Sequence, residues 1–105
     1  MNKYERAKAL LAEGKDATFK AFGNSMTPIL SSGSLLTFRA TDDYAVGDVV
    51  FSKVKGRYID AHKITKISSD GRFLISNNKG HDNGWTRQIF GRVIKANGKP
   101  FGRPT

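Results

Sequence analysis

The 105-residue sequence contains no cysteine. This excludes disulfide bonds, thiolate metal sites and a cysteine nucleophile. Long apolar runs are also missing, since no stretch approaches the roughly 18 residues that cross a bilayer. The polar residues 1–6 are not followed by an apolar segment, so we expect no secretory signal, no membrane span and a cytoplasmic protein.

Acidic residues are scarce beside basic ones. The sequence has 18 Lys and Arg against 9 Asp and Glu, a formal net charge of +9, and no acid follows Asp82. This balance favours acidic partners, so nucleic acid and an acidic protein are both alternatives to a merely solubilising surface. The cations are scattered along the chain, and composition does not decide among these readings.

The length and the apolar content predict one folded domain, 1–105. Hydrophobic residues make up 38% of the chain and aromatic residues 10%, which is enough for a core and argues against global disorder. A chain of this length has room for one core and no second domain.

A short helix is predicted over residues 2–13. Asn2 is a suitable N-cap, Glu5 three residues later completes a capping-box pattern, and apolar side chains recur on one face as far as Leu11. Gly14 is a natural residue just past the helix end. A helix this short is marginal alone, so we expect it to dock on the rest of the protein.

After residue 17 the pattern changes to short strands separated by turns. β-Branched and aromatic runs predict strands at 18–22, 35–39, 48–54, 57–68, 73–75 and 88–95. Asp70-Gly71 between two apolar runs indicates a hairpin. We expect residues 77–85 to form a polar loop and the basic tail 97–105 to be loosely ordered. The fold class predicted is mainly β: a small bent sheet or partly open barrel with one short N-terminal helix.

Ser25 lies in the most informative stretch, residues 23–34. Gly23 permits a tight turn, and Pro28 restricts its own backbone and that of Thr27. The Ser25 hydroxyl on such a turn can face a cleft beside free backbone N–H groups. From this stretch alone, an ordinary serine in a turn is the favoured interpretation.

His62 lies within the predicted strand 57–68. Strict alternation places Tyr58, Asp60, His62 and Ile64 on one face, with Lys63 on the other. A half-buried neutral histidine there can serve as a general base, although a lone histidine is usually structural.

Together, these stretches resemble the type I signal peptidases and their LexA-type relatives. The matching motifs are Gly-x-Ser-Met-x-Pro at 23–28, Gly33, Val-Gly-Asp-Val-Val-Phe at 46–51, the strand at 61–64, the loop at 79–83 and the strand at 90–94. The resemblance is closest to the archaeal and endoplasmic-reticulum signal peptidases, which have His where bacterial enzymes have Lys. The membrane anchor of those enzymes has no counterpart in this sequence.

The resemblance implies a small serine endopeptidase acting on a protein or peptide substrate. Ser25 would be the nucleophile, His62 the general base, and Asp82 the residue that orients His62. Asp60 is the weaker choice, because two residues along one strand give a poor direct bond to His62.

An alternative is a catalytically inactive binding module of the same fold. Its basic surface, with Trp85 and Phe101 as exposed aromatic residues, would then contact nucleic acid or an acidic protein. We expect no cofactor and no metal, because His62, His81 and Asp82 lack the close spacing of a metal site.

Overall fold

The computed structural model describes residues 1–104 and contains one helix, α1, at Lys3–Ala12. Asn2 caps it as predicted, with its side-chain oxygen accepting from the Glu5 N–H at 2.9 Å. The other half of the capping box is not formed, because the Glu5 carboxylate accepts instead from the Tyr58 hydroxyl at 2.8 Å. Leu11 is buried, so the helix docks on the sheet through its apolar face.

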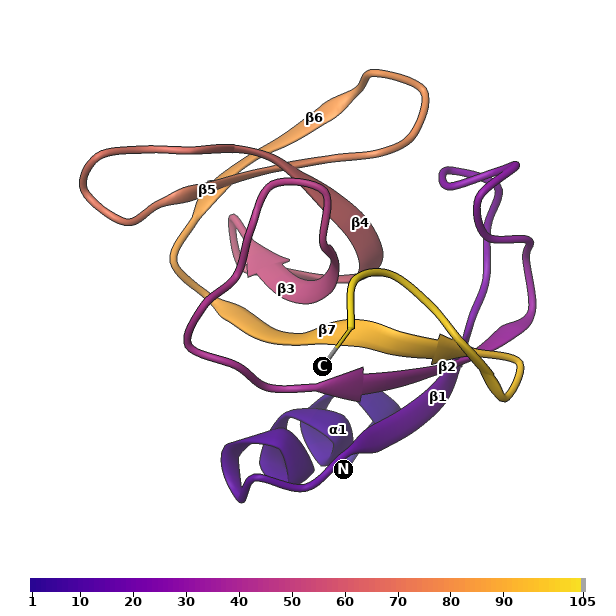
Figure 1. Cartoon of the computed structure of the whole chain (residues 1–105). Coiled ribbons are helices and arrows are strands. Elements are labelled where there is room, and N and C mark those ends of the chain that lie inside the picture. The colour runs from indigo at the N-terminus through magenta and orange to yellow at the C-terminus, as the bar shows by residue number, and fades with distance from the viewer. Residues whose placement is uncertain (105) are drawn as a thin grey trace.

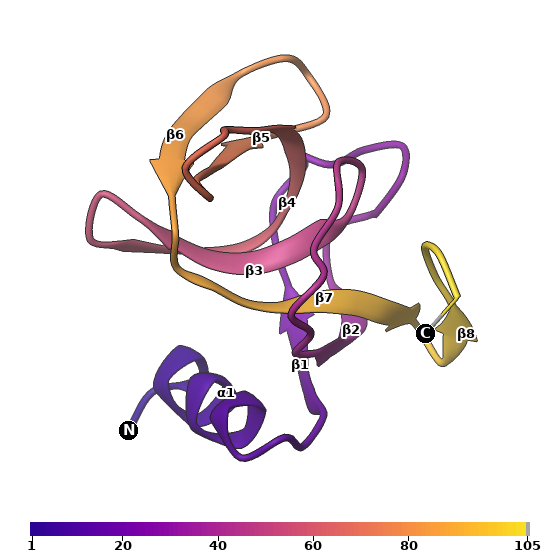
Figure 2. The same ribbon diagram turned by 60° about the vertical axis from the view of Figure 1, so that its left-hand side comes forward.

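The strands make up 45% of the chain and form one curled, half-barrel sheet (Figures 1 and 2). They are β1 Ala17–Ala21, β2 Ser34–Arg39, β3 Val49–Val54, β4 Arg57–Ile67, β5 Phe73–Ser76, β6 Asp82–Thr86, β7 Ile89–Ala96 and β8 Lys99–Pro100. The order across the sheet is β1-β2-β7-β3-β4-β5-β6, with β8 beside β7 and every pairing antiparallel.

The mainly β prediction is therefore confirmed, and the six predicted strands match within one residue at each end. β6 was missed. It lies inside the segment predicted to be a polar loop, because its sequence Asp-Asn-Gly-Trp-Thr is poor in strand formers and pairs only through its neighbour β5.

Two apolar clusters fill the curled sheet. The larger lies between α1 and the strands β1, β2, β3 and β7, around the stacked and edge-on rings of Phe19, Phe38 and Phe51. The smaller, around Ile64 and Ile75, lies where β3, β4 and β5 bend together. In both views α1 lies beneath the end of the sheet formed by β1, β2 and β7 (Figures 1 and 2).

β4 is bulged, and this changes which side chains share a face. Its register with β3 shifts by one residue between the Val50 and Ser52 pairs, so β4 contains an extra residue just before His62. Tyr58 consequently packs on the larger cluster while Ile64 belongs to the smaller one. The predicted common face of Tyr58 and Ile64 is wrong, because strict alternation fails across a bulge.

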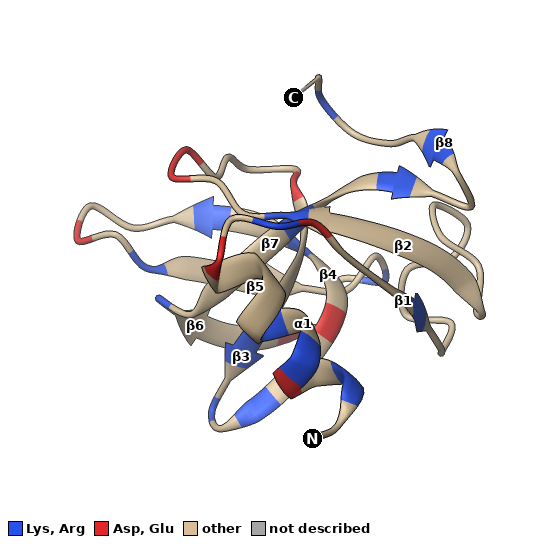
Figure 3. Ribbon diagram, turned by 90° about the horizontal axis from the view of Figure 1, so that it is seen from below, with Lys and Arg blue, Asp and Glu red and all other residues tan. Residues whose placement is uncertain are grey.

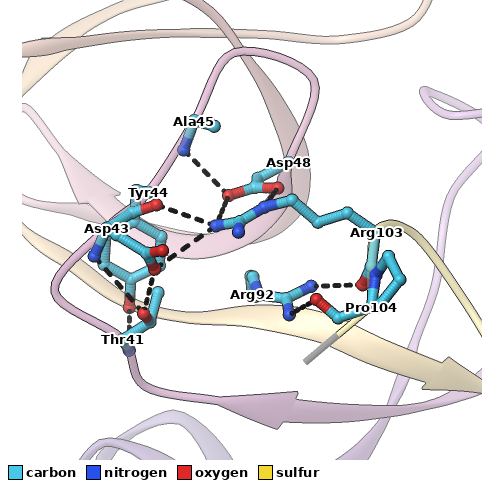
Figure 4. Close-up of polar contacts among 8 residues, drawn as sticks. All are labelled: Thr41, Asp43, Tyr44, Ala45, Asp48, Arg92, Arg103 and Pro104. Carbon is cyan, nitrogen blue, oxygen red and sulfur yellow. Dashed lines mark hydrogen bonds and ion pairs between the residues drawn. The ribbon is translucent and has the colours of Figure 1, made fainter.

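The tail after Asn97 is tied down rather than loose. β8 pairs with β7, and the Arg103 guanidinium forms hydrogen bonds of 2.8 and 3.0 Å with the buried Asp48 carboxylate (Figure 4). The buried Arg92 donates to the carbonyl oxygens of Arg103 and Pro104, both at 3.1 Å. Thr105, the last residue of the predicted tail, lies outside the described residues.

Within residues 1–104, no helix has the length and apolar character needed to cross a membrane.

Candidate active site

Ser25 lies on the loop that joins β1 to β2. Gly23 begins this loop with a φ of 112°, a conformation that glycine adopts readily, and its N–H donates to Ser32 Oγ at 2.9 Å. Asn78, from the loop between β5 and β6, holds the other side: its N–H donates to the Ser25 carbonyl at 2.8 Å and its amide to the Thr27 carbonyl at 3.0 Å. The position of Ser25 is thus set by contacts from two distant segments.

The Ser25 hydroxyl meets His62 directly. Ser25 Oγ lies 2.8 Å from His62 Nε2, and both residues are half-buried. Ser25 and His62 are 37 residues apart in sequence, and it is the curl of β4 that brings the ring to the loop. A hydroxyl and an imidazole nitrogen at this distance can exchange a proton.

Asn83 occupies the other side of the histidine ring. Asn83 Oδ1 lies 2.6 Å from His62 Nδ1. An amide oxygen only accepts hydrogen bonds, so Nδ1 carries the ring proton and Nε2 presents its lone pair to the Ser25 hydroxyl. This arrangement, which we call the Ser–His–Asn chain (Ser25, His62 and Asn83), sets His62 up to remove a proton from Ser25.

Asp82, predicted to orient His62, lies elsewhere. Its carboxylate accepts from Ser76 Oγ at 2.6 Å, and Ser76 Oγ lies 2.8 Å from Thr65 Oγ1. The reason is a bulge in β6: Ser76 pairs with Asp82 while Ile75 pairs with Gly84, so Asn83 is the extra residue and its side chain is redirected toward His62. One inserted residue therefore replaces a carboxylate by an amide at this position.

The other charged neighbours do not contact His62 in the described structure. Asp60 lines the pocket beside Ser25 and also lies near Tyr4 of α1, where burial first and then this carboxylate raise the pKa of the Tyr4 hydroxyl. Lys63 points to the Asn78 amide oxygen, 3.4 Å from its Nζ. Among residues 1–104, no three His, Asp or Glu side chains are gathered to hold a metal ion.

A small pocket opens beside the Ser25 hydroxyl, with a cavity volume of about 20 Å³. Apolar side chains such as Ala21, Met26, Leu30 and Leu36 form part of its wall, and the Asp60 carboxylate also lines it. Across residues 1–104, the backbone N–H of Ser25 makes no hydrogen bond. A free N–H beside the nucleophile can donate to an oxyanion that forms there.

Comparison with protein-family models identifies the family of the chain. The family model described as Peptidase S24-like matches residues 2–94, most of the chain. The chain belongs to the Peptidase S24-like family. This places the S24-like domain in the LexA and signal peptidase superfamily, as the sequence motifs indicated. No individual curated protein matches the chain.

The S24-like domain departs from its family in one respect. Family members typically pair the serine with a lysine, whereas His62 faces Ser25 here. Asn78 and Asn83, which hold the loop and the ring, were not singled out from the sequence. Asn83 does end the motif at 79–83, but a carboxylate is the usual partner of a histidine base, and a one-residue bulge has no sequence signal strong enough to favour the amide.

Proposed function

We propose that this S24-like domain is a serine endopeptidase with Ser25 as nucleophile and His62 as general base. The observation that carries the proposal is the 2.8 Å contact from Ser25 Oγ to His62 Nε2, with Asn83 on Nδ1 at 2.6 Å. A serine hydroxyl is a weak nucleophile alone and needs a base within hydrogen-bond reach.

The chemistry follows the geometry. His62 Nε2 takes the Ser25 proton as Oγ attacks the peptide carbonyl carbon, and the resulting oxyanion accepts from the free Ser25 N–H. The C–N bond then breaks, and the leaving amine receives the proton from His62, which leaves an acyl-serine. Water, deprotonated by the same ring, attacks the acyl group and releases Ser25.

The substrate proposed is a peptide with a small apolar side chain next to the cleaved bond. Ala21, Met26, Leu30 and Leu36 line the pocket beside Ser25 and suit a short apolar side chain, and the Asp60 carboxylate on the same wall disfavours an acidic one. The Ser–His pairing also supports a finer relationship, to the archaeal and endoplasmic-reticulum signal peptidases, within the superfamily.

A fluorophosphonate probe, which labels only activated serines, tests the proposal. Labelling of the wild-type chain at Ser25, followed by hydrolysis of a quenched peptide library, is the expected result. Ser25→Ala should abolish both signals, His62→Ala should nearly do so, and Lys63→Ala should leave both close to wild type. Loss of labelling in Lys63→Ala with retention in His62→Ala would overturn the assignment of His62 as base.

A second candidate function is a binding surface for nucleic acid. Trp85 is 41% exposed, and the Arg72 guanidinium lies 5.6 Å from its ring, an arrangement on which a base can stack. Against this, Phe101 packs on the larger core cluster rather than standing exposed, and the Lys and Arg residues are spread over several elements (Figure 3). To test this, binding of a single-stranded oligonucleotide is measured at increasing salt concentration. We expect affinity to fall steeply with salt in the wild-type protein and binding to be lost in Trp85→Ala.

A further inference from the structure

A second pocket lies behind Asn83, between the β3–β4 hairpin and the start of β6. Its volume is about 380 Å³, within the range of small-ligand sites. Lys55, Arg57 and His81 line it together with Asn83, over an apolar floor of Val54 and Ile59. Asn83 therefore belongs to both the Ser–His–Asn chain and this pocket.

The charge of this pocket has one sign. No Asp or Glu is among its lining residues. Within the described residues, neither Lys55 nor Arg57 forms a salt bridge. By contrast, the cations Arg39, Arg72 and Arg103 are each paired with a carboxylate elsewhere in the molecule. Two unneutralised cations beside one pocket favour an anionic ligand.

The position of Lys55 is built into the fold. Lys55 has a φ of 52° at the tip of the β3–β4 hairpin, and its side chain crosses β6 at Gly84. A Cβ atom at Gly84 would lie 3.2 Å from Lys55 Cε, closer than an ordinary contact. The absence of a side chain at Gly84 thus leaves room for the lysine to lie along the pocket wall.

Asn83 supplies a neutral donor. Its Oδ1 is engaged by His62 Nδ1, and its Nδ2 amide group has no acceptor among residues 1–104. An anion that accepts from Nδ2 would hold the amide with Oδ1 toward His62. That orientation is the one that keeps the proton on Nδ1 and the lone pair on Nε2.

We propose that this pocket binds a phosphate group, either free phosphate or the phosphate of a small monoester. Two cations suit a dianion better than a single carboxylate, and the planar Arg57 guanidinium matches two phosphate oxygens at once. Occupation of the pocket orients Asn83 and so supports His62 as a base. Only this last step rests on the proposed peptidase function; the binding itself does not.

The binding test uses the full chain carrying Ser25→Ala, so that no peptidase activity is needed. Inorganic phosphate and adenosine monophosphate are titrated at constant ionic strength, with acetate as the carboxylate probe. We expect saturable shifts of the Asn83 side-chain NH2 signals and the His81 ring signals. Tighter binding of adenosine monophosphate than of inorganic phosphate would identify a phosphate monoester as the ligand. Equal binding would show that the phosphate group alone is recognised, which identifies free phosphate as the ligand. Equal binding of acetate, or shifts that do not saturate, would overturn the proposal.

The matched variants locate the site. Arg57→Ala and Lys55→Ala should each weaken phosphate binding by about tenfold, since a charge-assisted contact is lost. Arg72→Ala, which removes another exposed cation, one that is paired with Asp70, should leave phosphate binding unchanged. Thermal melting verifies that each variant is folded. Equal weakening in all three would show general charge attraction and contradict a site behind Asn83.

The coupling to His62 has its own readout. In a protein with wild-type Ser25, phosphate should raise the rate of fluorophosphonate labelling severalfold, and Arg57→Ala should remove this increase but keep the basal rate. If phosphate binds and labelling occurs without any increase, the step from the pocket to His62 is wrong. If labelling does not occur at all while phosphate binds, the peptidase proposal fails and the anion site stands.

Discussion

The Ser–His–Asn chain and the cluster around Asp48 and Arg103 are both assembled from polar groups distant in sequence. They differ in whether their hydrogen-bonding groups are satisfied within the protein. In the cluster around Asp48 and Arg103, the charged groups have partners within the protein. Asp48 accepts from Arg103 and from the Ala45 N–H, and Arg92 donates to carbonyl oxygens of the tail (Figure 4). In the Ser–His–Asn chain, the Ser25 hydroxyl, with a free N–H beside it, borders an open pocket.

This difference separates stability from chemistry. The cluster around Asp48 and Arg103 also borders a pocket, but its charged groups already pair with one another and with backbone carbonyls, so its main role is to hold the tail against the loop before β3. A polar cluster that leaves a nucleophile and a donor facing a pocket still has interactions to offer a substrate. Substitutions at Ser25, His62 or Asn83 should therefore change activity, whereas substitutions at Asp48 or Arg103 should change stability.

The largest effect expected is the loss of activity in Ser25→Ala, by a factor of at least about 10⁴. The hydroxyl is the attacking group, and no other residue can replace it. The free energy of unfolding should stay within about 0.5 kcal/mol of wild type, because the side chain is only half-buried. Peptide hydrolysis measures the activity and urea unfolding measures the stability. A marked loss of stability would mean that the Ser–His–Asn chain also supports the fold.

Asn83→Ala should reduce peptidase activity by about a hundredfold and leave a measurable remainder. His62 would keep its contact with Ser25 but lose the acceptor that holds the proton on Nδ1. Asn83→Asp restores an acceptor and should recover most of the activity, whereas Asp82→Asn should have little effect on turnover. A larger loss in Asp82→Asn than in Asn83→Ala would contradict the assignment of Asn83.

Asp48→Ala should affect stability rather than activity, and we expect it to lower the free energy of unfolding by about 2 kcal/mol. The carboxylate is 5% exposed, and its removal leaves Arg103 without its main partner and the Ala45 N–H without an acceptor. Arg103 is 34% exposed and can turn to water, which limits the cost. Specific activity of the folded fraction should be unchanged; a parallel loss of activity would erase the distinction between the clusters.

Acid should loosen the Arg103 cluster before it affects the hydrophobic core. The Thr41 hydroxyl first, and Arg103 second, hold the pKa of Asp43 below its ordinary value of 3.8. A lowered pKa in the folded state contributes stability above the unfolded value, and that stability is lost as pH falls through the folded value. Arg103→Gln should therefore show a smaller drop in melting temperature than wild type between about pH 5 and about pH 3.

The smallest effect concerns a polar atom that belongs to neither cluster. Ser52 is fully buried on β3, and within residues 1–104 its Oγ has no hydrogen-bond partner. Ser52→Ala removes an unsatisfied hydroxyl, so the free energy of unfolding should be unchanged or higher by up to about 1 kcal/mol. Thermal melting measures this, and a clear destabilisation would show that the hydroxyl has a partner.

Much of the fold could be predicted from local patterns. Strand-forming runs bounded by turn residues located six strands, and the Asn2 cap located the helix. These signals are local because each depends on a few neighbouring residues. Strand β6 was not predicted, because its stability comes from pairing with β5 and not from its own composition.

The mainly β architecture, the Ser25 and His62 members of the candidate site and the absence of thiol chemistry could all be inferred from the amino-acid sequence. The third member of the site and the boundaries of the second pocket became visible only in the folded protein. The physical reason is the same in both cases. A bulge changes the face of a side chain through pairing with a distant strand, and an unpaired cation is recognised only when all its neighbours in space are known.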